Sequence, residues 1–169
     1  VEFQATLMDG QGASPLDQLL ALSNELRGKF LLVVDGAIPY DANASMTTMG
    51  VTSAGEEWTA QRLIGQLAER AMAVLALGTC AAFGGIPSAA PNVGGYGPVT
   101  RLVGEGTPLV RLPGCPPNPG WIMETLVTVL SDGLTALDLD SLGRPRFAYG
   151  GVVHDDCPRR DSFERGDYA

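Results

Sequence analysis

The residues with the clearest chemistry in this sequence are its three cysteines, Cys80, Cys115 and Cys157. Each lies in a turn rich in glycine or proline, just beyond an apolar run, whereas a cysteine that only packs usually lies inside such a run. Two of the three are followed directly by proline, which removes a backbone donor and restrains the turn, as in the Cys-Pro ends of ferredoxin cluster motifs. This arrangement favours metal ligation by thiolates.

The single histidine, His154, lies three residues before Cys157. A lone histidine is most often a surface residue or a satisfied core residue. A cysteine at this spacing favours ligation, because imidazole and thiolate both bind zinc or iron. Two ligands cannot complete a tetrahedral site, so further ligands come from outside this sequence or the pair belongs to a partner. We interpret the neighbouring Arg159 and Arg160 as an ordinary solvated pair.

Two glycine clusters, at residues 84–85 and 94–97, raise the alternative of a phosphate-binding loop. Neither has the Gly-x-Gly-x-x-Gly spacing between a strand and a helix, so nucleotide binding is not favoured. The glycines indicate instead a close backbone approach to a neighbouring body, such as a cluster or another subunit. A disulfide framework is also disfavoured, because three cysteines leave one over and a domain of this size does not need one.

The elements that position the cysteines alternate between short apolar runs and amphipathic segments. Continuous apolar runs that end at turn residues are typical of strands buried on both faces, and they lie at residues 29–34, 73–77 and 108–112. Helical spacing predicts helices at residues 16–26, 56–70 and from 119 onward, with a last short extended piece at 146–150. This alternation predicts an α/β domain, doubly wound around a parallel sheet with right-handed crossovers.

This fold places Cys80 and Cys115 just beyond the carboxyl ends of two successive strands. Ligands of such sheets bind in the crevice at that edge, so both thiols are candidates to converge on one object. The alternatives are two unrelated loop cysteines, or a disulfide between neighbouring loops.

Composition limits the classes of function. The 169 residues are 45% hydrophobic and 18% charged, which is typical of one packed domain. A formal net charge of −8 argues against nucleic acid as a partner, because phosphates require a basic surface. No apolar run approaches the roughly 20 residues that span a bilayer, and the given sequence shows no basic and apolar leader, so we expect the chain as given to be soluble, with only indirect membrane contact. The start at Val rather than Met is interpreted as a processed, truncated or partly recorded chain.

Four motifs resemble a known family in their order and spacing: residues 35–39 (Asp-Gly-Ala-Ile-Pro), 78–85 (Gly-Thr-Cys-Ala-Ala-Phe-Gly-Gly), 114–119 (Gly-Cys-Pro-Pro-Asn-Pro) and 154–160 (His-Asp-Asp-Cys-Pro-Arg-Arg). The sequence is similar, over nearly its whole length, to the small iron-sulfur subunit of nickel-iron hydrogenases. A cluster-bearing subunit of respiratory complex I shares the two cysteine turns in looser form. The His-x-x-Cys-Pro-Arg-Arg segment points specifically to hydrogenase.

The resemblance implies a ligand role for four residues. Cys80 and Cys115 would be two ligands of a proximal [4Fe-4S] cluster, and His154 and Cys157 the first two ligands of a distal [4Fe-4S] cluster. A medial [3Fe-4S] or [4Fe-4S] cluster would require a C-terminal region beyond this sequence. The family takes its other proximal ligands from a Cys-x-x-Cys after its first strand, and this sequence has no such motif.

The resemblance also implies a division of the chain. Residues 1–150 would form a flavodoxin-like cluster-binding domain without its first strand, so residues 1–3 would enter the second strand. Residues 151–169 would begin the C-terminal iron-sulfur region.

These implications describe the electron-transfer subunit of a hydrogenase, an oxidoreductase acting on H2. The large-subunit partner would carry the Ni-Fe centre, and no catalytic residue for hydrogen chemistry is expected on this chain. Electrons would pass through the clusters to or from a cytochrome or a quinone-linked protein. The loops at residues 38–39, 83–87 and 116–119 are expected to contact the large subunit. The resemblance favours a periplasmic or membrane-associated location and leaves a cytoplasmic one open.

Two other classes of function stay open. A complex I type quinone reductase subunit would share the fold and the two cysteine turns, but would not need His154 and Cys157. A flavodoxin-like binding or scaffold protein would use the cysteines only for packing. Iron content separates the scaffold from the two cluster proteins, and hydrogen-dependent dye reduction separates those two from each other.

Overall fold

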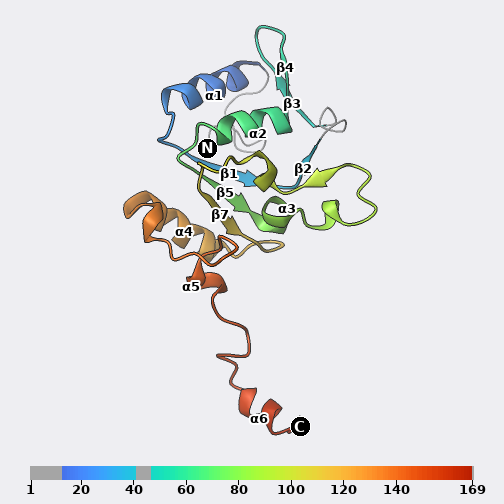
Figure 1. Ribbon diagram of the computed structural model, residues 1–169, viewed down its shortest axis with the longest axis vertical. Coiled ribbons are helices and arrows are strands. Elements are labelled where there is room, and N and C mark those ends of the chain that lie inside the picture. Colours follow the sequence, from blue (N-terminus) through green and yellow to red (C-terminus); the bar gives the residue numbers. More distant parts are fainter. Residues whose placement is uncertain (1–12, 41–46, 169) are drawn as a thin grey trace.

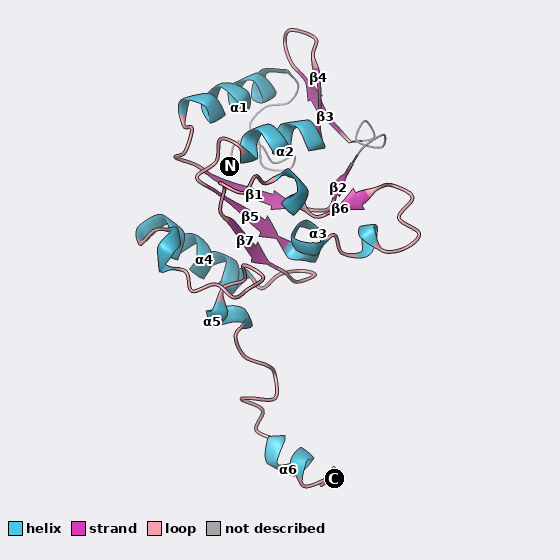
Figure 2. Ribbon diagram, viewed as in Figure 1, coloured by secondary structure: helices cyan, strands magenta, loops and turns pink. Residues whose placement is uncertain are grey.

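The computed structural model describes residues 13–40 and 47–168, and it contains the predicted parallel sheet. Three strands lie side by side in the order β1 (Leu31–Asp35), β5 (Ala73–Leu77) and β7 (Leu109–Leu112) (Figure 2). Both neighbouring pairs are parallel, and Leu75 of β5 lies opposite Val33 on one side and Val110 on the other. The three predicted strands are confirmed. The expected strand entry at residues 1–3 lies outside the described residues.

Helices and short strands precede, connect and follow these three strands. The longer helices are α1 (Ala13–Glu25), α2 (Ala60–Ala68) and α4 (Pro119–Ser131). Short helices are α3 (Gly78–Phe83), α5 (Arg146–Tyr149), α6 (Arg160–Glu164) and the 3-10 helices η2 (Ile86–Ser88), η3 (Val99–Leu102) and η4 (Leu134–Ala136). Two antiparallel pairs join β2 (Ile38–Pro39) to β6 (Tyr96–Gly97) and β3 (Thr48–Val51) to β4 (Glu57–Thr59).

Core packing on both faces of the sheet explains why its strands are continuous apolar runs. Val74 and Ala76 of β5 belong to one core cluster together with Ala68 of α2. Leu75, between them, belongs to a second cluster together with Val129 of α4. The split follows from geometry, because successive residues of a strand point to opposite faces. Helices α2 and α4 therefore cover opposite faces, and the predicted doubly wound α/β class is confirmed (Figure 1).

Helix α4 begins where the sequence predicts. The side chain of Asn118 caps it by accepting a hydrogen bond from the backbone N–H of Gly120 at 2.8 Å. Pro119 occupies the first turn, where its missing N–H costs no intrahelical hydrogen bond.

Helix α2 begins at Ala60, four residues later than the predicted start at residue 56. The intervening residues form β4, which pairs with β3 in an antiparallel hairpin. Thr59 then caps α2 by accepting a hydrogen bond from the backbone N–H of Arg62 at 3.2 Å. Trp58 fits a helical spacing, but it packs from β4 into the same cluster as Leu63, which is why the pattern alone predicted a longer helix.

The prediction of an extended piece at residues 146–150 is wrong, because this segment forms helix α5. The carbonyl of Pro145 accepts a hydrogen bond from the backbone N–H of Tyr149 at 3.0 Å, which closes a single helical turn. Tertiary contacts hold that turn: the Tyr149 ring meets Trp121 of α4 edge-on, with the centroids 5.1 Å apart. One turn is too short to show a helical period in the sequence.

Beyond α5 the chain runs away from the sheet to α6 and the C-terminal end (Figure 1). This segment, residues 150–168, is called the tail below. Its Val152 and Val153 are exposed. The expected division of the chain at residue 150 stays a prediction. Within residues 13–40 and 47–168, no helix has the length and apolar character required to cross a membrane.

Candidate metal centre

The carboxyl ends of β5 and β7 carry the two cysteine turns that the sequence singles out. Cys80 is the third residue of α3, which begins directly after β5. Cys115 follows β7 by three residues. The Cys80 side chain is half-buried and Cys115 is exposed, and both are free thiols. Cys80 and Cys115 are therefore not joined in the disulfide that the sequence left open as an alternative.

Two hydrogen bonds fasten the turns to each other. The backbone N–H of Thr79 donates to the carbonyl of Gly114 at 3.0 Å. In return, the Oγ1 of Thr79 accepts from the backbone N–H of Gly114 at 3.0 Å. Cys80 directly follows Thr79, and Cys115 directly follows Gly114. These hydrogen bonds therefore hold the backbone next to both cysteines together at the edge of the sheet. The pair Thr79 and Gly114 is called the turn clamp below.

Gly85 closes the turn on the other side of Cys80. A Cβ atom added at Gly85 would lie 2.6 Å from the Sγ of Cys80, closer than a real Cβ approaches another atom, and 3.1 Å from its Cα, which is a tight contact. Its φ of +57° and ψ of −154° also suit only glycine. The close contact of Gly85 is with Cys80 of the same chain. The expected approach of residues 84–85 to a cluster or another subunit stays a prediction.

Helix α5 is hydrogen-bonded to the loop that leads into the Cys115 turn. The phenol of Tyr149 donates a hydrogen bond to the carbonyl of Pro113 at 2.7 Å, two residues before Cys115. Burial raises the pKa of Tyr149, while the nearby Arg144 guanidinium lowers it, and the net shift is upward. The phenol therefore keeps the proton that it donates.

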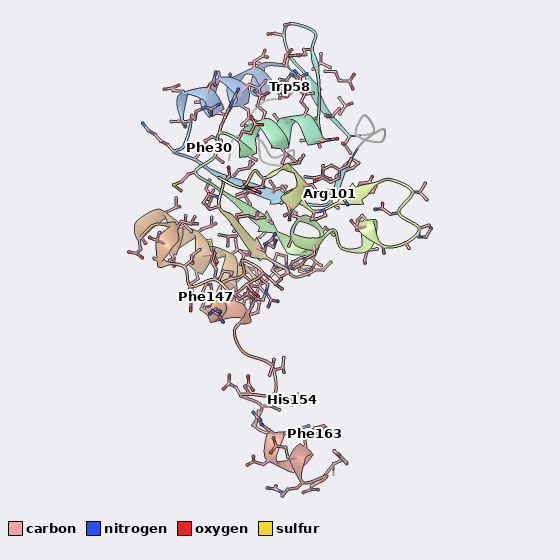
Figure 3. All side chains as sticks on the ribbon, viewed as in Figure 1. Phe30, Trp58, Arg101, Phe147, His154 and Phe163 are labelled. Atoms are coloured by element: carbon pink, nitrogen blue, oxygen red, sulfur yellow. The ribbon has the colours of Figure 1, made fainter. Side chains whose placement is uncertain are left out.

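The second predicted pair, His154 and Cys157, lies in the tail, away from the sheet edge (Figure 3). The backbone N–H of Cys157 donates to the carbonyl of His154 at 3.4 Å, so the two residues share one turn. His154 is exposed and Cys157 is half-buried. The imidazole stacks on the ring of Phe163, with the centroids 5.5 Å apart and the planes inclined by 25°.

The structure thus brings together the two turns of the first pair and the two residues of the second pair, but it keeps the pairs apart. In the described part of the chain, no group of three or more histidine, cysteine or acidic side chains is arranged to hold a metal ion. Each pair has donors that suit iron, but two donors are only half of the four that a [4Fe-4S] cluster takes. The ligand roles of Cys80, Cys115, His154 and Cys157 remain predictions.

Three supporting residues were not found from the sequence: Thr79, Tyr149 and Phe163. Thr79 had a visible signal, since a hydroxyl between a glycine and a cysteine at a strand end can cap a neighbouring turn. Tyr149 and Phe163 had no such signal, because their contacts with Pro113 and His154 depend on how the chain folds.

The fold and this sheet edge define a parallel α/β domain that presents thiols beyond the ends of two strands. A family model described as "NADH ubiquinone oxidoreductase, 20 Kd subunit" matches residues 1–129. Because that match covers most of the sequence, the chain belongs to this family.

Similar proteins also include hydrogenase small subunits. The periplasmic NiFeSe hydrogenase small subunit of Desulfomicrobium baculatum is 34% identical, and the match covers 100% of this chain and 58% of that protein. The hydrogenase-2 small chain of Escherichia coli (strain K12) is 36% identical over 85% of this chain and 36% of its own length. A crystal structure of a reduced, active form of the Ni-Fe-Se hydrogenase from Desulfomicrobium baculatum superimposes with a TM-score of 0.91 at 35% identity, covering 100% of this chain and 65% of that one.

The resemblance to hydrogenase small subunits is therefore confirmed, and it extends over the whole chain. The chain spans about half the length of the relatives it matches, 58% in the first case and 36% in the second.

Proposed function

We propose that this chain is the electron-transfer small subunit of a nickel-iron hydrogenase. One observation carries the proposal. The match to the 20 kDa subunit family ends at residue 129, whereas the hydrogenase small subunit of Desulfomicrobium baculatum matches through the turn of His154 and Cys157 to the end of the chain. That turn is the feature that a complex I type subunit does not need.

In this proposal Cys80 and Cys115 are two thiolate ligands of a proximal [4Fe-4S] cluster, and His154 and Cys157 are two ligands of a distal one. A cluster of this type supplies a site that takes up and releases one electron at a time. The remaining ligands come from outside the described residues. The contribution of this chain is to present its ligands at fixed positions: the turn clamp holds the Cys80 and Cys115 turns together, and Gly85 lies against the Cys80 thiol.

The surface beside Cys80 supports a large-subunit partner. Phe83 and Ile86, directly after the Cys80 turn, are 43% and 85% exposed, and Pro116 on the other turn is exposed as well. Apolar side chains left in water next to a functional edge favour a protein interface there. Ile38 and Pro39, also expected at this interface, are buried inside the chain by β2 and β6, so we assign the interface to the other two loops.

The function is tested on the purified heteromeric complex by measuring iron per complex and hydrogen-dependent dye reduction. The proposal expects both, and expects Cys80→Ser to lower both, because a hydroxyl is a poorer iron ligand than a thiolate. Val51→Ser, a change at an exposed residue of β3 that is 29 positions from Cys80 and farther from the other ligand candidates in the sequence, serves as the control. Iron without hydrogen-dependent activity would favour the complex I type alternative, and a complex without iron would favour the scaffold alternative.

A further inference from the structure

The tail contains a small folded unit around His154 that the sequence pattern did not reveal. Its first part is the turn of His154 and Cys157, and its second part is helix α6. Arg160, the first residue of this helix, joins the two parts, because its guanidinium pairs with Asp155 in the turn at 3.4 Å; within the helix it also pairs with Glu164 at 2.8 Å. The carbonyl of Cys157 also accepts from the backbone N–H of Arg160 at 3.0 Å. The turn and the helix are therefore tied at more than one point.

This connection brings the Phe163 ring onto the imidazole of His154. The centroid distance of 5.5 Å and the angle of 25° between the planes describe a stacked pair rather than an edge contact. Phe163 is in turn met edge-on by Tyr168, with the centroids 5.9 Å apart. The phenyl ring therefore has a second aromatic contact, near the end of the tail.

The stack has a specific consequence for ligation. The lone pair of an imidazole nitrogen lies in the plane of the ring, so a metal bound there also lies in that plane. A phenyl ring on the face of the imidazole restrains the ring plane and blocks neither nitrogen. Within residues 13–40 and 47–168, no hydrogen bond to either ring nitrogen of His154 is formed, so stacking is the contact that orients it.

Building on the proposed function, we propose that Phe163 is a positioning residue that presents the His154 imidazole to the distal cluster. Helix α6 is the element that carries Phe163 to the histidine, and the ion pair of Arg160 with Asp155 links that element to the turn. Val152 and Val153, which precede His154 in the chain, are exposed.

The first test uses proton NMR of the 169-residue chain, in which the single histidine makes the imidazole signals unambiguous. A stacked phenyl ring shifts these signals upfield of those of free histidine. We expect Phe163→Leu to abolish this shift and Phe163→Tyr, which keeps a ring, to retain it. Tyr168→Leu is the matched control, because it removes a ring that touches Phe163 and not His154. Free-histidine shifts in the unaltered chain, or no change in Phe163→Leu, would overturn the proposal.

The second test uses the intact iron-loaded complex and the nitrogen hyperfine coupling of its reduced clusters. The unaltered complex should show a histidine nitrogen coupling that is lost in His154→Cys, altered in Phe163→Leu and restored in Phe163→Tyr. If the coupling is present but Phe163→Leu leaves it unchanged, the positioning role is wrong and the proposed function stands. If the unaltered complex lacks the coupling, His154 is not a ligand and the distal site of the proposed function is wrong.

Discussion

At the scale of single residues, this chain uses glycine and aromatic contacts to set the positions of its ligand candidates. Gly85 lies against the Cys80 thiol where no side chain fits, and Phe163 lies on the face of His154. Neither residue has a group that binds iron. Each of them contacts a ligand candidate. Substituting Gly85 or Phe163 therefore tests how that candidate is held in place, which a mutation of the candidate itself does not test.

Substituting Gly85→Ala should destabilise the chain, because the new Cβ would overlap the Cys80 thiol and its backbone conformation suits only glycine. We expect a loss of about 1–3 kcal/mol in the free energy of unfolding from the backbone strain alone, measured by urea denaturation. Gly104→Ala is the matched control, since a Cβ there meets nothing within 4 Å. Equal stability of the two variants would show that the close approach is not retained in solution.

His154 and Cys80 should give different kinetic defects if they serve different clusters. His154→Cys should leave hydrogen/deuterium exchange by the complex largely intact and slow dye reduction, because a neutral imidazole and a charged thiolate set different cluster potentials at the exit of the relay. Cys80→Ser should depress every hydrogen-dependent electron transfer. The two assays are run side by side on each variant. Abolished exchange with normal dye reduction in His154→Cys would contradict the distal assignment.

At the scale of elements, the parallel strands decide which turns meet. β5 and β7 are neighbours, so their carboxyl ends bring the two cysteine turns to one edge, where the turn clamp joins them. The clamp connects an α3 residue to a loop residue, and α5 supports the same loop through Tyr149. The candidate site is therefore built from three short segments, namely α3, the loop after β7 and α5, which the sheet brings together.

Thr79→Val should weaken this alignment, because it removes the hydroxyl that accepts from the backbone N–H of Gly114. We expect a loss of about 1 kcal/mol in the free energy of unfolding, together with less iron per purified complex. Thr107→Val removes a comparable hydrogen bond, from its Oγ1 to the carbonyl of Ala68, at a place outside the cysteine turns. It should lower stability without lowering iron content. Iron loss in Thr107→Val and not in Thr79→Val would refute a role for the clamp in holding the ligands.

At the scale of the whole molecule, the phenols of Tyr40 and Tyr149 make the free energy of unfolding depend on pH in the alkaline range. Burial raises the pKa of Tyr40 to about 12, although the nearby Arg101 lowers it, and the phenol donates to the carbonyl of Pro98 at 2.6 Å. Burial also raises the pKa of Tyr149. Both phenols are neutral in the folded chain at a pH where an unfolded chain has begun to ionise.

The stability contributed by Tyr40 should be complete below pH 10, the usual pKa of a tyrosine, and should be lost as the pH rises toward about 12. The sign follows because the unfolded state binds fewer protons than the folded state in this range. Urea midpoints measured from pH 9 to 12 should fall less steeply in Tyr40→Phe than in the unaltered chain. Identical slopes would show that this phenol does not ionise differently on unfolding.

The sequence by itself determined the α/β class, the three parallel strands and the places of the cysteine turns. Apolar runs and the turn residues after them are local signals, and they carry this information without tertiary contacts. The sequence pattern predicted the start of α2 too early and predicted an extended piece where α5 forms. Both errors arise because packing against Leu63 and Trp121 sets the positions of Trp58 and Tyr149.

Only the tertiary structure decided how the candidate ligands are supported. The turn clamp joins residues 35 positions apart in the chain, and the phenol of Tyr149 reaches Pro113 across 36. Phe163 meets His154 only because α6 folds back on the turn. Such contacts leave no period or motif in the sequence, because their geometry depends on where the sheet and the helices place each backbone segment.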